Sequence, residues 1–214
     1  LGYGFAEAPR GAYARLGVSD GLDSAPVTLR DNLRRLAQAP LYFAPGTQWR
    51  YSLGIDVIGA VIEQVTAQRL PHAIDALVLR PAALQGFAFA VPRRQHLATP
   101  YADGGPRPLR MTRDMRVASP GMAGGGVVFD PARAYSASAF PSGGGGMIGT
   151  APGYLRFLEV LRAGGAPVLA RAAPADWMQP LVGPQAQTQG PGWGFGYGGA
   201  VLVDPVAAAS PQSA

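Results

Sequence analysis

A tyrosine and a serine stand next to each other in PGTQWRYSLGIDVIGAVIEQV, residues 45–65. The phenol of Tyr51 could transfer a proton, and the hydroxyl of Ser52 could act as a nucleophile or a hydrogen-bonding group. Both follow a Pro-Gly turn and precede a helical pattern, so they stand where a loop enters a helix and where side chains can be held yet reach a cleft. A packed aromatic ring beside a capping hydroxyl would use the same spacing, so the pair alone leaves both interpretations open.

The surroundings of Ser52 do not fit a nucleophile elbow. The stretch RYSLG, residues 50–54, keeps half of a Gly-x-Ser-x-Gly pattern, but Arg50 occupies the first glycine position. An elbow also needs a strand before its serine, and a Pro-Gly turn stands there instead. The sequence therefore favours a nucleophile elsewhere.

No motif for metal or phosphate chemistry is present. His72 and His96 are far apart and lack the His-Glu-x-x-His spacing or a carboxylate cluster, so we expect no metal site and place both histidines on the surface. The glycine run 143–146 lacks the Lys-Ser/Thr of a phosphate-binding loop. We interpret it as a backbone turn before a helix, and we expect no cofactor.

Composition excludes several classes of protein. Of 214 residues, 48% are hydrophobic and 14% are charged, which is typical of a globular chain. The net charge of +5 comes from arginine alone, and the densest basic stretch, 107–116, has no interleaved aromatic residues, so nucleic acid is not the expected partner. No apolar run approaches the ~18 residues that a membrane-spanning helix needs. The chain has no cysteine, so cysteine usage does not indicate the redox compartment. The localisation, whether periplasmic, secreted or cytoplasmic, therefore stays undetermined.

Hydrophobic periodicity, together with turn and capping residues, predicts the helices and strands that hold the Tyr-Ser pair. Helices are expected at 28–39, 54–69, 71–80 and 151–163, and strands at 86–92, near Tyr101, at 125–130 and within 192–205. Residues 1–28 are expected to be mostly loop. In the second helix one apolar stripe is expected to be buried, with Asp56 lying off it; its members are Ile55, Ile58, Val61, Ile62 and Val65.

Both ends of the chain are typical of cuts through a larger protein. It opens on LGYGF with neither an initiator methionine nor a signal peptide, and it closes on VDPVAAASPQSA directly after a strand-like run. We therefore expect a segment of a longer chain.

Taken together, the motifs resemble the serine β-lactamase and penicillin-binding-protein superfamily, and most of all its class C β-lactamase-like branch with the related carboxylesterases. FAPGTQWRYSLGIDVIGAVIEQVT is similar to the segment around that family's second active-site motif. GGGGMIGTAPGYLRFLEVLRAGG and GWGFGYGGAVLVDP resemble two later segments in the same order. The matching positions around the tyrosine are Phe43, Pro45, Gly46, Tyr51, Ser52, Gly54, Gly59 and Glu63.

The resemblance implies the fold. We expect an α/β protein with a β-lactamase-like fold, of which this chain is a fragment dominated by the helical subdomain with a few short strands. The chain would form a single partial domain over 1–214. Within it, 1–140 is mostly helical subdomain and loops, 141–205 returns toward the α/β body, and 206–214 is a tail.

The resemblance also implies a mechanism. In the family, a serine in Ser-x-x-Lys attacks an acyl carbonyl, and the lysine and the motif tyrosine handle its proton. Tyr51 would be that tyrosine, with its pKa of about 10 perturbed, or its proton shared, by a neighbouring cation. This chain has no lysine, so it cannot contain Ser-x-x-Lys, and the third-motif strand is also missing. We expect the segment alone to be inactive, within a parent serine hydrolase.

The residues after Tyr51 bear on the substrate. Ser52 and Leu53 are the expected substrate-binding positions. Where the family has asparagine at the position of Leu53, its amide can hydrogen-bond a β-lactam, and leucine cannot. The expected partner is therefore a small-molecule ester, favoured over a β-lactam. A non-catalytic relative with a binding or regulatory role, and a basic nucleic-acid-binding domain, remain the alternative hypotheses. The oligomeric state is left open.

Overall fold

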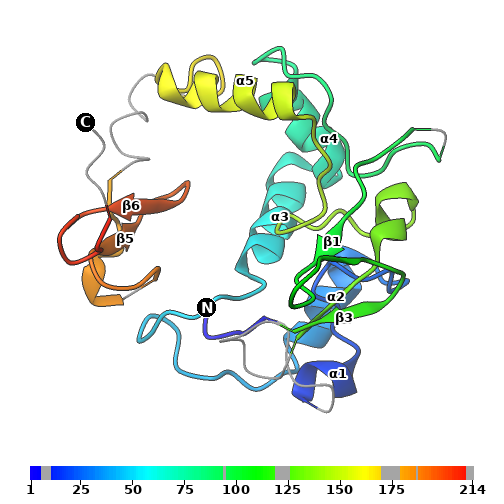
Figure 1. The fold of residues 1–214 in the computed structure, drawn as a ribbon, viewed down its shortest axis with the longest axis horizontal. Coiled ribbons are helices and arrows are strands. Elements are labelled where there is room, and N and C mark those ends of the chain that lie inside the picture. The colour runs from blue at the N-terminus through cyan, green and yellow to red at the C-terminus, as the bar shows by residue number, and fades with distance from the viewer. Residues whose placement is uncertain (6–10, 94, 119–125, 170–178, 187, 211–214) are drawn as a thin grey trace.

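The computed structural model describes residues 1–5, 11–93, 95–118, 126–169, 179–186 and 188–210. Helices and short strands, joined by long connections, are arranged in an arch (Figure 1). The α-helices within these ranges are α1 Ala12–Leu16, α2 Leu29–Leu36, α3 Gly54–Thr66, α4 Leu70–Ile74 and α5 Ala151–Arg162. A π-helical segment, Asp75–Leu79, continues α4, and 3₁₀ turns cover Pro131–Tyr135 and Pro184–Ala186.

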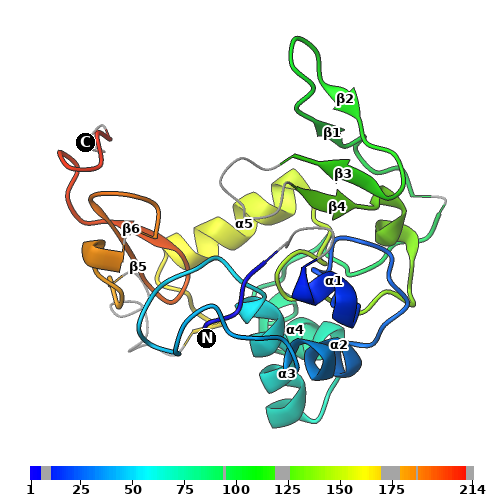
Figure 2. The same cartoon turned by 90° about the horizontal axis from the view of Figure 1, so that it is seen from below.

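The strands form three separate antiparallel pairs (Figure 2). β1 (Tyr101–Ala102) pairs with β2 (Leu109–Arg110), β3 (Met115–Val117) with β4 (Val127–Phe129), and β5 (Trp193–Phe195) with β6 (Ala200–Leu202). The expected strand at 86–92 is wrong, because this stretch contributes only an isolated bridge between Ala88 and Ile148. The run 192–205 is a hairpin rather than one strand.

Local chemistry explains where the helices begin. The Thr28 hydroxyl accepts a hydrogen bond from the Asp31 amide at 3.1 Å, and the Thr150 hydroxyl accepts one from the Gly153 amide at 3.2 Å. Each satisfies an amide that would otherwise have no partner in the first turn. The four predicted helices are confirmed within a few residues of their ends. The short helix α1 was not predicted.

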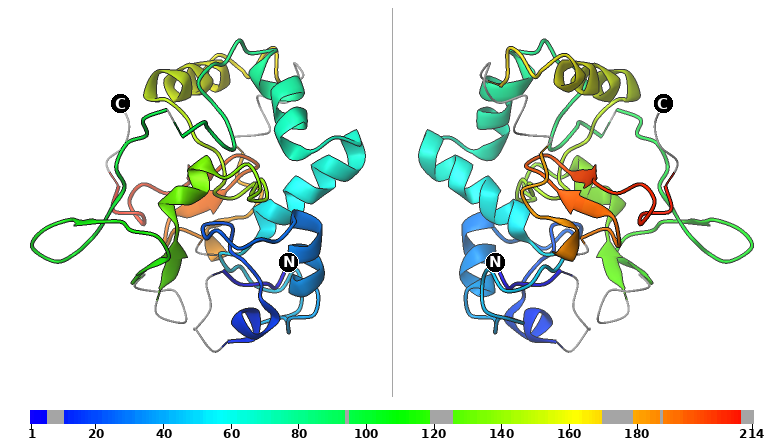
Figure 3. Two further views of the ribbon diagram at one scale, coloured as in Figure 1. Left: turned by 90° about the vertical axis from the view of Figure 1, so that its right-hand side faces the viewer. Right: turned by 90° about the vertical axis from the view of Figure 1, so that its left-hand side faces the viewer.

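The core lies where α1 and α2 meet the entrance of α3. Its buried members are Tyr13, Leu36, Ala39 and Leu53, and α3 also packs on α2 and α4. Figure 3 shows α2, α3 and α4 following one another along one side of the molecule. This packing fixes the direction in which the 45–53 loop enters α3.

Helix α3 exposes most of its apolar stripe and buries a different side. The buried side carries Asp56 and Gly59, and a Cβ added at Gly59 would lie 3.1 Å from the Leu70 side chain. The prediction of a buried stripe is wrong for residues 1–214, since Ile55, Ile58, Val61 and Val65 are 53%, 51%, 55% and 80% exposed. An exposed apolar stripe of this kind is typical of an interaction surface.

A similar apolar face is exposed on α5. Tyr154, Leu155 and Leu158 are exposed there. In Figure 1 the β5–β6 hairpin stands at the left and α3 lies near the centre. No helix in the described ranges is long and apolar enough to cross a membrane. In the expected tail, Val206 is 85% exposed, and 211–214 lie outside the described residues.

Candidate functional site

Tyr51 lines a cavity of about 380 Å³, called here the Tyr51 cleft. Five parts of the chain form it: the first residues, the loop after Ser19, the 49–56 segment, the glycine run, and strand β5. The lining residues are Phe5, Asp20, Leu22, Trp49, Arg50, Tyr51, Ser52, Leu53, Gly54, Ile55, Asp56, Gly144, Gly145 and Phe195. Segments far apart in the sequence thus converge on the tyrosine.

The phenol ring of Tyr51 is held by packing and open to solvent. Its ring meets the Phe5 ring edge-on, with the centroids 5.1 Å apart and an angle of 89° between the planes. The residue is 55% exposed. The adjacent Arg50 places its guanidinium 3.7 Å from the centroid of the Tyr42 ring, so this cation stacks on a different tyrosine. A proton-transfer role for Tyr51 therefore needs a cation from another part of the protein.

Ser52 and Leu53 line the same cleft, but each also bonds to or packs on the protein itself. The Ser52 hydroxyl accepts a hydrogen bond from the Gly54 amide at 3.2 Å, at the entrance of α3. Leu53 is 2% exposed and belongs to the core, and its amide donates to the Gly4 carbonyl at 3.3 Å. A ligand in the cleft can therefore touch little of the Leu53 side chain.

Asp56 is a site residue that the sequence pattern does not reveal. It is 2% exposed, and its carboxylate accepts a hydrogen bond from the Gly144 amide at 3.4 Å. Burial raises the pKa of Asp56, while hydrogen bonds from Ser142 and from the amides of Gly144 and Gly143 act in the opposite direction. A single aspartate off an apolar stripe is usually on the solvent side, so only the long-range contact distinguishes it.

A second carboxyl in the cleft has an altered pKa. Burial raises the pKa of Asp20 to about 6, with Asp23 and Asp56 adding to the increase and the Leu22 amide opposing it. Arg133, which is 7% exposed, is the nearby cation: burial lowers its pKa, and the charges of Asp23, Asp56 and Asp20 oppose that change. Buried groups with altered pKa values in a cleft are typical of functional sites.

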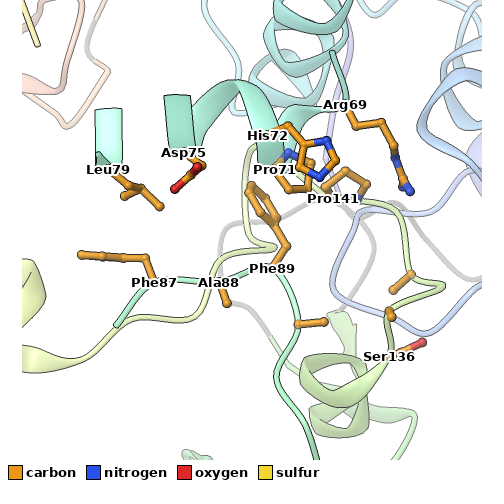
Figure 4. A pocket seen from close by; sticks show the side chains of 13 residues that line it. Arg69, Pro71, His72, Asp75, Leu79, Phe87, Ala88, Phe89, Ser136 and Pro141 are labelled. Carbon is orange, nitrogen blue, oxygen red and sulfur yellow. The ribbon is translucent and has the colours of Figure 1, made fainter. Parts of the chain in front are cut away.

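A separate groove of about 360 Å³ lies beside α4 (Figure 4). Arg69, His72 and Asp75 line one wall, and Phe87 and Phe89 lie across from them. His72 and Arg69 are exposed, and Asp75 forms an ion pair with Arg80 at 2.8 Å. Nothing buried and polar converges here, so the Tyr51 cleft is the better candidate site.

The histidines do not come together, and both are exposed as predicted. Among the residues that the structure describes, no three His, Cys, Asp or Glu side chains are grouped so that they could hold a metal ion.

The fold and the tyrosine segment define a class of protein. The chain matches the Beta-lactamase family over residues 9–209 and belongs to it. The resemblance seen in the sequence is therefore confirmed, as is the β-lactamase-like fold class.

Two relatives are informative. The chain is 48% identical over 217 residues to esterase EstB from Burkholderia gladioli, covering 100% of this chain and 54% of EstB. It superimposes on EstCE1, a hydrolase with promiscuous acyltransferase activity, with a TM-score of 0.92 and 43% identity over 99% of this chain and 56% of that one. The chain thus spans about half the length of either protein.

The fold extends to distant relatives. A penicillin-binding protein from Bacillus halodurans matches with a TM-score of 0.58 and 20% identity, over 85% of this chain and 48% of that one. At this identity the likeness concerns the fold alone.

Proposed function

We propose that the protein containing this chain is a serine hydrolase that cleaves esters through an acyl-enzyme, with Tyr51 as the group that handles the nucleophile's proton. One observation carries the proposal. Tyr51 is exposed in a cleft where five segments meet, in a chain 48% identical to an esterase. The nucleophile and its lysine would come from outside residues 1–214, because the chain contains no lysine.

The geometry suits proton transfer by the phenol. The edge-on contact with Phe5 restrains the ring without covering it, so the hydroxyl can reach a group placed in the cleft. A positioned acid–base group needs this combination of fixed orientation and access. The alternative hypothesis of a non-catalytic relative predicts the same fold but no dependence of any reaction on Tyr51.

The walls of the cleft favour an ester with an apolar part. Phe5, Leu22, Trp49 and Phe195 supply apolar surface around the tyrosine. Apolar walls stabilise a ligand's hydrocarbon and leave orientation to a few polar groups. We assign Ser52 and Leu53 to the substrate-binding wall of the cleft, where Ser52 holds the entrance of α3 through the Gly54 amide and the largely buried Leu53 supports the wall from the core. Neither offers the amide that a β-lactam would use, so ester cleavage is favoured over β-lactam cleavage.

The test uses the complete open reading frame and a short-chain aryl ester. Tyr51→Phe removes only the hydroxyl, and we expect turnover to fall by about 10²–10⁴-fold, the usual contribution of an acid–base group. Tyr101→Phe is the matched control, because Tyr101 is 56% exposed and does not line the cleft. The proposal is wrong if the Tyr51→Phe protein hydrolyses the ester as fast as the control does. A chromogenic cephalosporin assayed in parallel measures the preference for esters.

A further inference from the structure

We propose that Asp56 and Ser142 together form a clamp that holds the glycine run against the first turn of α3, and that this clamp positions the wall of the Tyr51 cleft for catalysis. The inference rests on the proposed acyl transfer at Tyr51. Asp56 and Ser142 are positioning residues in it, since they act through the backbone of Gly144 and Gly145.

The first step is the carboxylate. Asp56 occupies the first turn of α3, where an acidic side chain commonly serves its own helix, but its partners lie elsewhere. It accepts hydrogen bonds from the Gly144 amide, 88 positions along the chain, and from the Ser142 side chain. The amide of Gly54 is instead satisfied by Ser52. The Asp56 carboxylate is therefore committed to the glycine run.

The second step is the serine. Ser142 is 1% exposed, and its hydroxyl accepts a hydrogen bond from the Gly145 amide at 3.1 Å. A hydroxyl has one proton to donate, and Asp56 is the carboxylate beside it. The hydrogen bonds thus run from the Gly145 amide through Ser142 to Asp56. The Asp56 side chain therefore takes hydrogen bonds from both Ser142 and the Gly144 amide, which ties two positions around the glycine run to α3.

The third step is the close approach of the backbones. A Cβ at Gly143 would lie 2.7 Å from the carbonyl oxygen of Ile55, so the glycine run touches the first turn of α3 directly. A Cβ at Gly21 would lie 2.5 Å from the Ser142 hydroxyl, which brings the loop carrying Asp20 to the same point. The glycine run, the first turn of α3 and the loop carrying Asp20 therefore approach one another closely around Ser142. Positioning on this scale matters, because a displacement of about 1 Å can cost about 10²-fold in rate.

The experiment compares Asp56→Asn, Ser142→Ala and the double variant in the complete protein, with aryl-ester hydrolysis and thermal unfolding as readouts. Asparagine keeps the size of Asp56 but loses its charge and one of its two acceptor oxygens, which an NH2 donor replaces. We expect kcat to fall by about 10- to 100-fold with a smaller change in KM. Ser142→Ala should also lower kcat. The double variant should be no slower than Asp56→Asn, because two parts of one clamp do not contribute independently.

Asp130→Asn is the matched control. Asp130 is 3% exposed and holds Ser24, Arg113 and the Ala132 amide, but it does not line the cleft. It should lower the melting temperature without lowering kcat. The clamp is refuted if Asp56→Asn behaves like Asp130→Asn, or if the losses of the single variants multiply in the double variant. Should Asp56→Asn fail to fold, a Ser142→Ala protein with unchanged kcat refutes it equally.

Tyr51→Phe in the same assay separates this inference from the proposed function. An active Tyr51→Phe protein overturns the proposed function. An inactive Tyr51→Phe protein beside a fully active Asp56→Asn protein overturns only the clamp.

Discussion

The Ser52 hydroxyl oxygen lies 3.2 Å from the backbone nitrogen of Gly54 and accepts its hydrogen bond. The serine beside Tyr51 is thereby bonded to the backbone at the entrance of α3, where Leu53 is the N-cap residue. The two hydroxyls of the Tyr-Ser pair have different tasks: one is committed to the backbone, and the other is free to face the cleft.

Ser52→Ala should therefore affect stability more than catalysis. Loss of one such hydrogen bond costs about 0.5–1.5 kcal/mol, so the free energy of unfolding should fall by about 1 kcal/mol while ester turnover stays within a few-fold of wild type. Urea unfolding and aryl-ester hydrolysis measure the two effects. If this variant lost all activity while Tyr51→Phe kept it, Ser52 would be the nucleophile and the role given to Tyr51 would be incorrect.

Leu53→Asn should destabilise the protein without producing a β-lactamase. Leu53 is 2% exposed in the core beside Tyr13, Leu36 and Ala39. Replacement loses apolar packing and buries an amide without a partner, at a combined cost of about 2–5 kcal/mol. Leu53→Met, which conserves volume, should cost less than about 1.5 kcal/mol. Cephalosporin hydrolysis that rises in Leu53→Asn relative to ester hydrolysis would show that this side chain reaches the substrate after all.

The sequence predicts what is local and misses what depends on distant contacts. Thr28 and Thr150 cap two of the predicted helices, and each bonds an amide only three residues ahead. The burial of Asp56 was not recognisable, because its partner Gly144 is 88 residues away. Tyr51 was found through the family motif rather than through its spacing. The expected strand at 86–92 failed because alternation cannot show whether a partner strand lies alongside.

The glycine run offers a paired test of the contact with α3. A methyl group at Gly143 would lie 2.7 Å from the Ile55 carbonyl oxygen, whereas one at Gly144 would have its nearest neighbour at 3.9 Å. Gly143→Ala should therefore destabilise by about 1–3 kcal/mol, as overpacking against backbone does, while Gly144→Ala should be tolerated. Thermal unfolding of the two variants decides the point, and equal melting temperatures would mean that the glycine run does not press on α3.

The exposed apolar faces make a prediction about residues 1–214 expressed alone. Ile58 and Val61 of α3 and Leu155 of α5 are 51%, 55% and 62% exposed. Exposed apolar faces of this kind bind hydrophobic dyes or associate. We expect strong dye fluorescence from this segment and little from the complete protein. The pair Ile58→Gln and Val61→Gln should lower the dye signal of the segment, and a segment that melts cooperatively as a monomer without binding dye would contradict the prediction.

The pH dependence of stability should expose the unusual Asp20. Burial raises its pKa from 3.8 to about 6, so between these values the native state holds a proton that the unfolded state has released. The contribution of Asp20 to the free energy of unfolding therefore falls as pH rises from about 4 to about 6, and it stays low at higher pH. Asparagine cannot ionise, and its side-chain oxygen can still accept the hydrogen bond that the Leu22 amide gives Asp20 at 3.0 Å.

Asp20→Asn should accordingly raise stability above pH 6, by at most about 3 kcal/mol, and should match the wild type near pH 3.5. Asp31 supplies a control of opposite sign, because the Thr28 hydroxyl and nearby arginines lower its pKa. Asp31→Asn should be less stable than wild type at neutral pH, and that difference should shrink as pH falls through the lowered pKa. Urea unfolding of the three proteins at pH 3.5, 5 and 7.5 is the measurement. An Asp20→Asn protein that is no more stable than wild type at pH 7.5 would show that Asp20 stays ionised in the cleft at little cost.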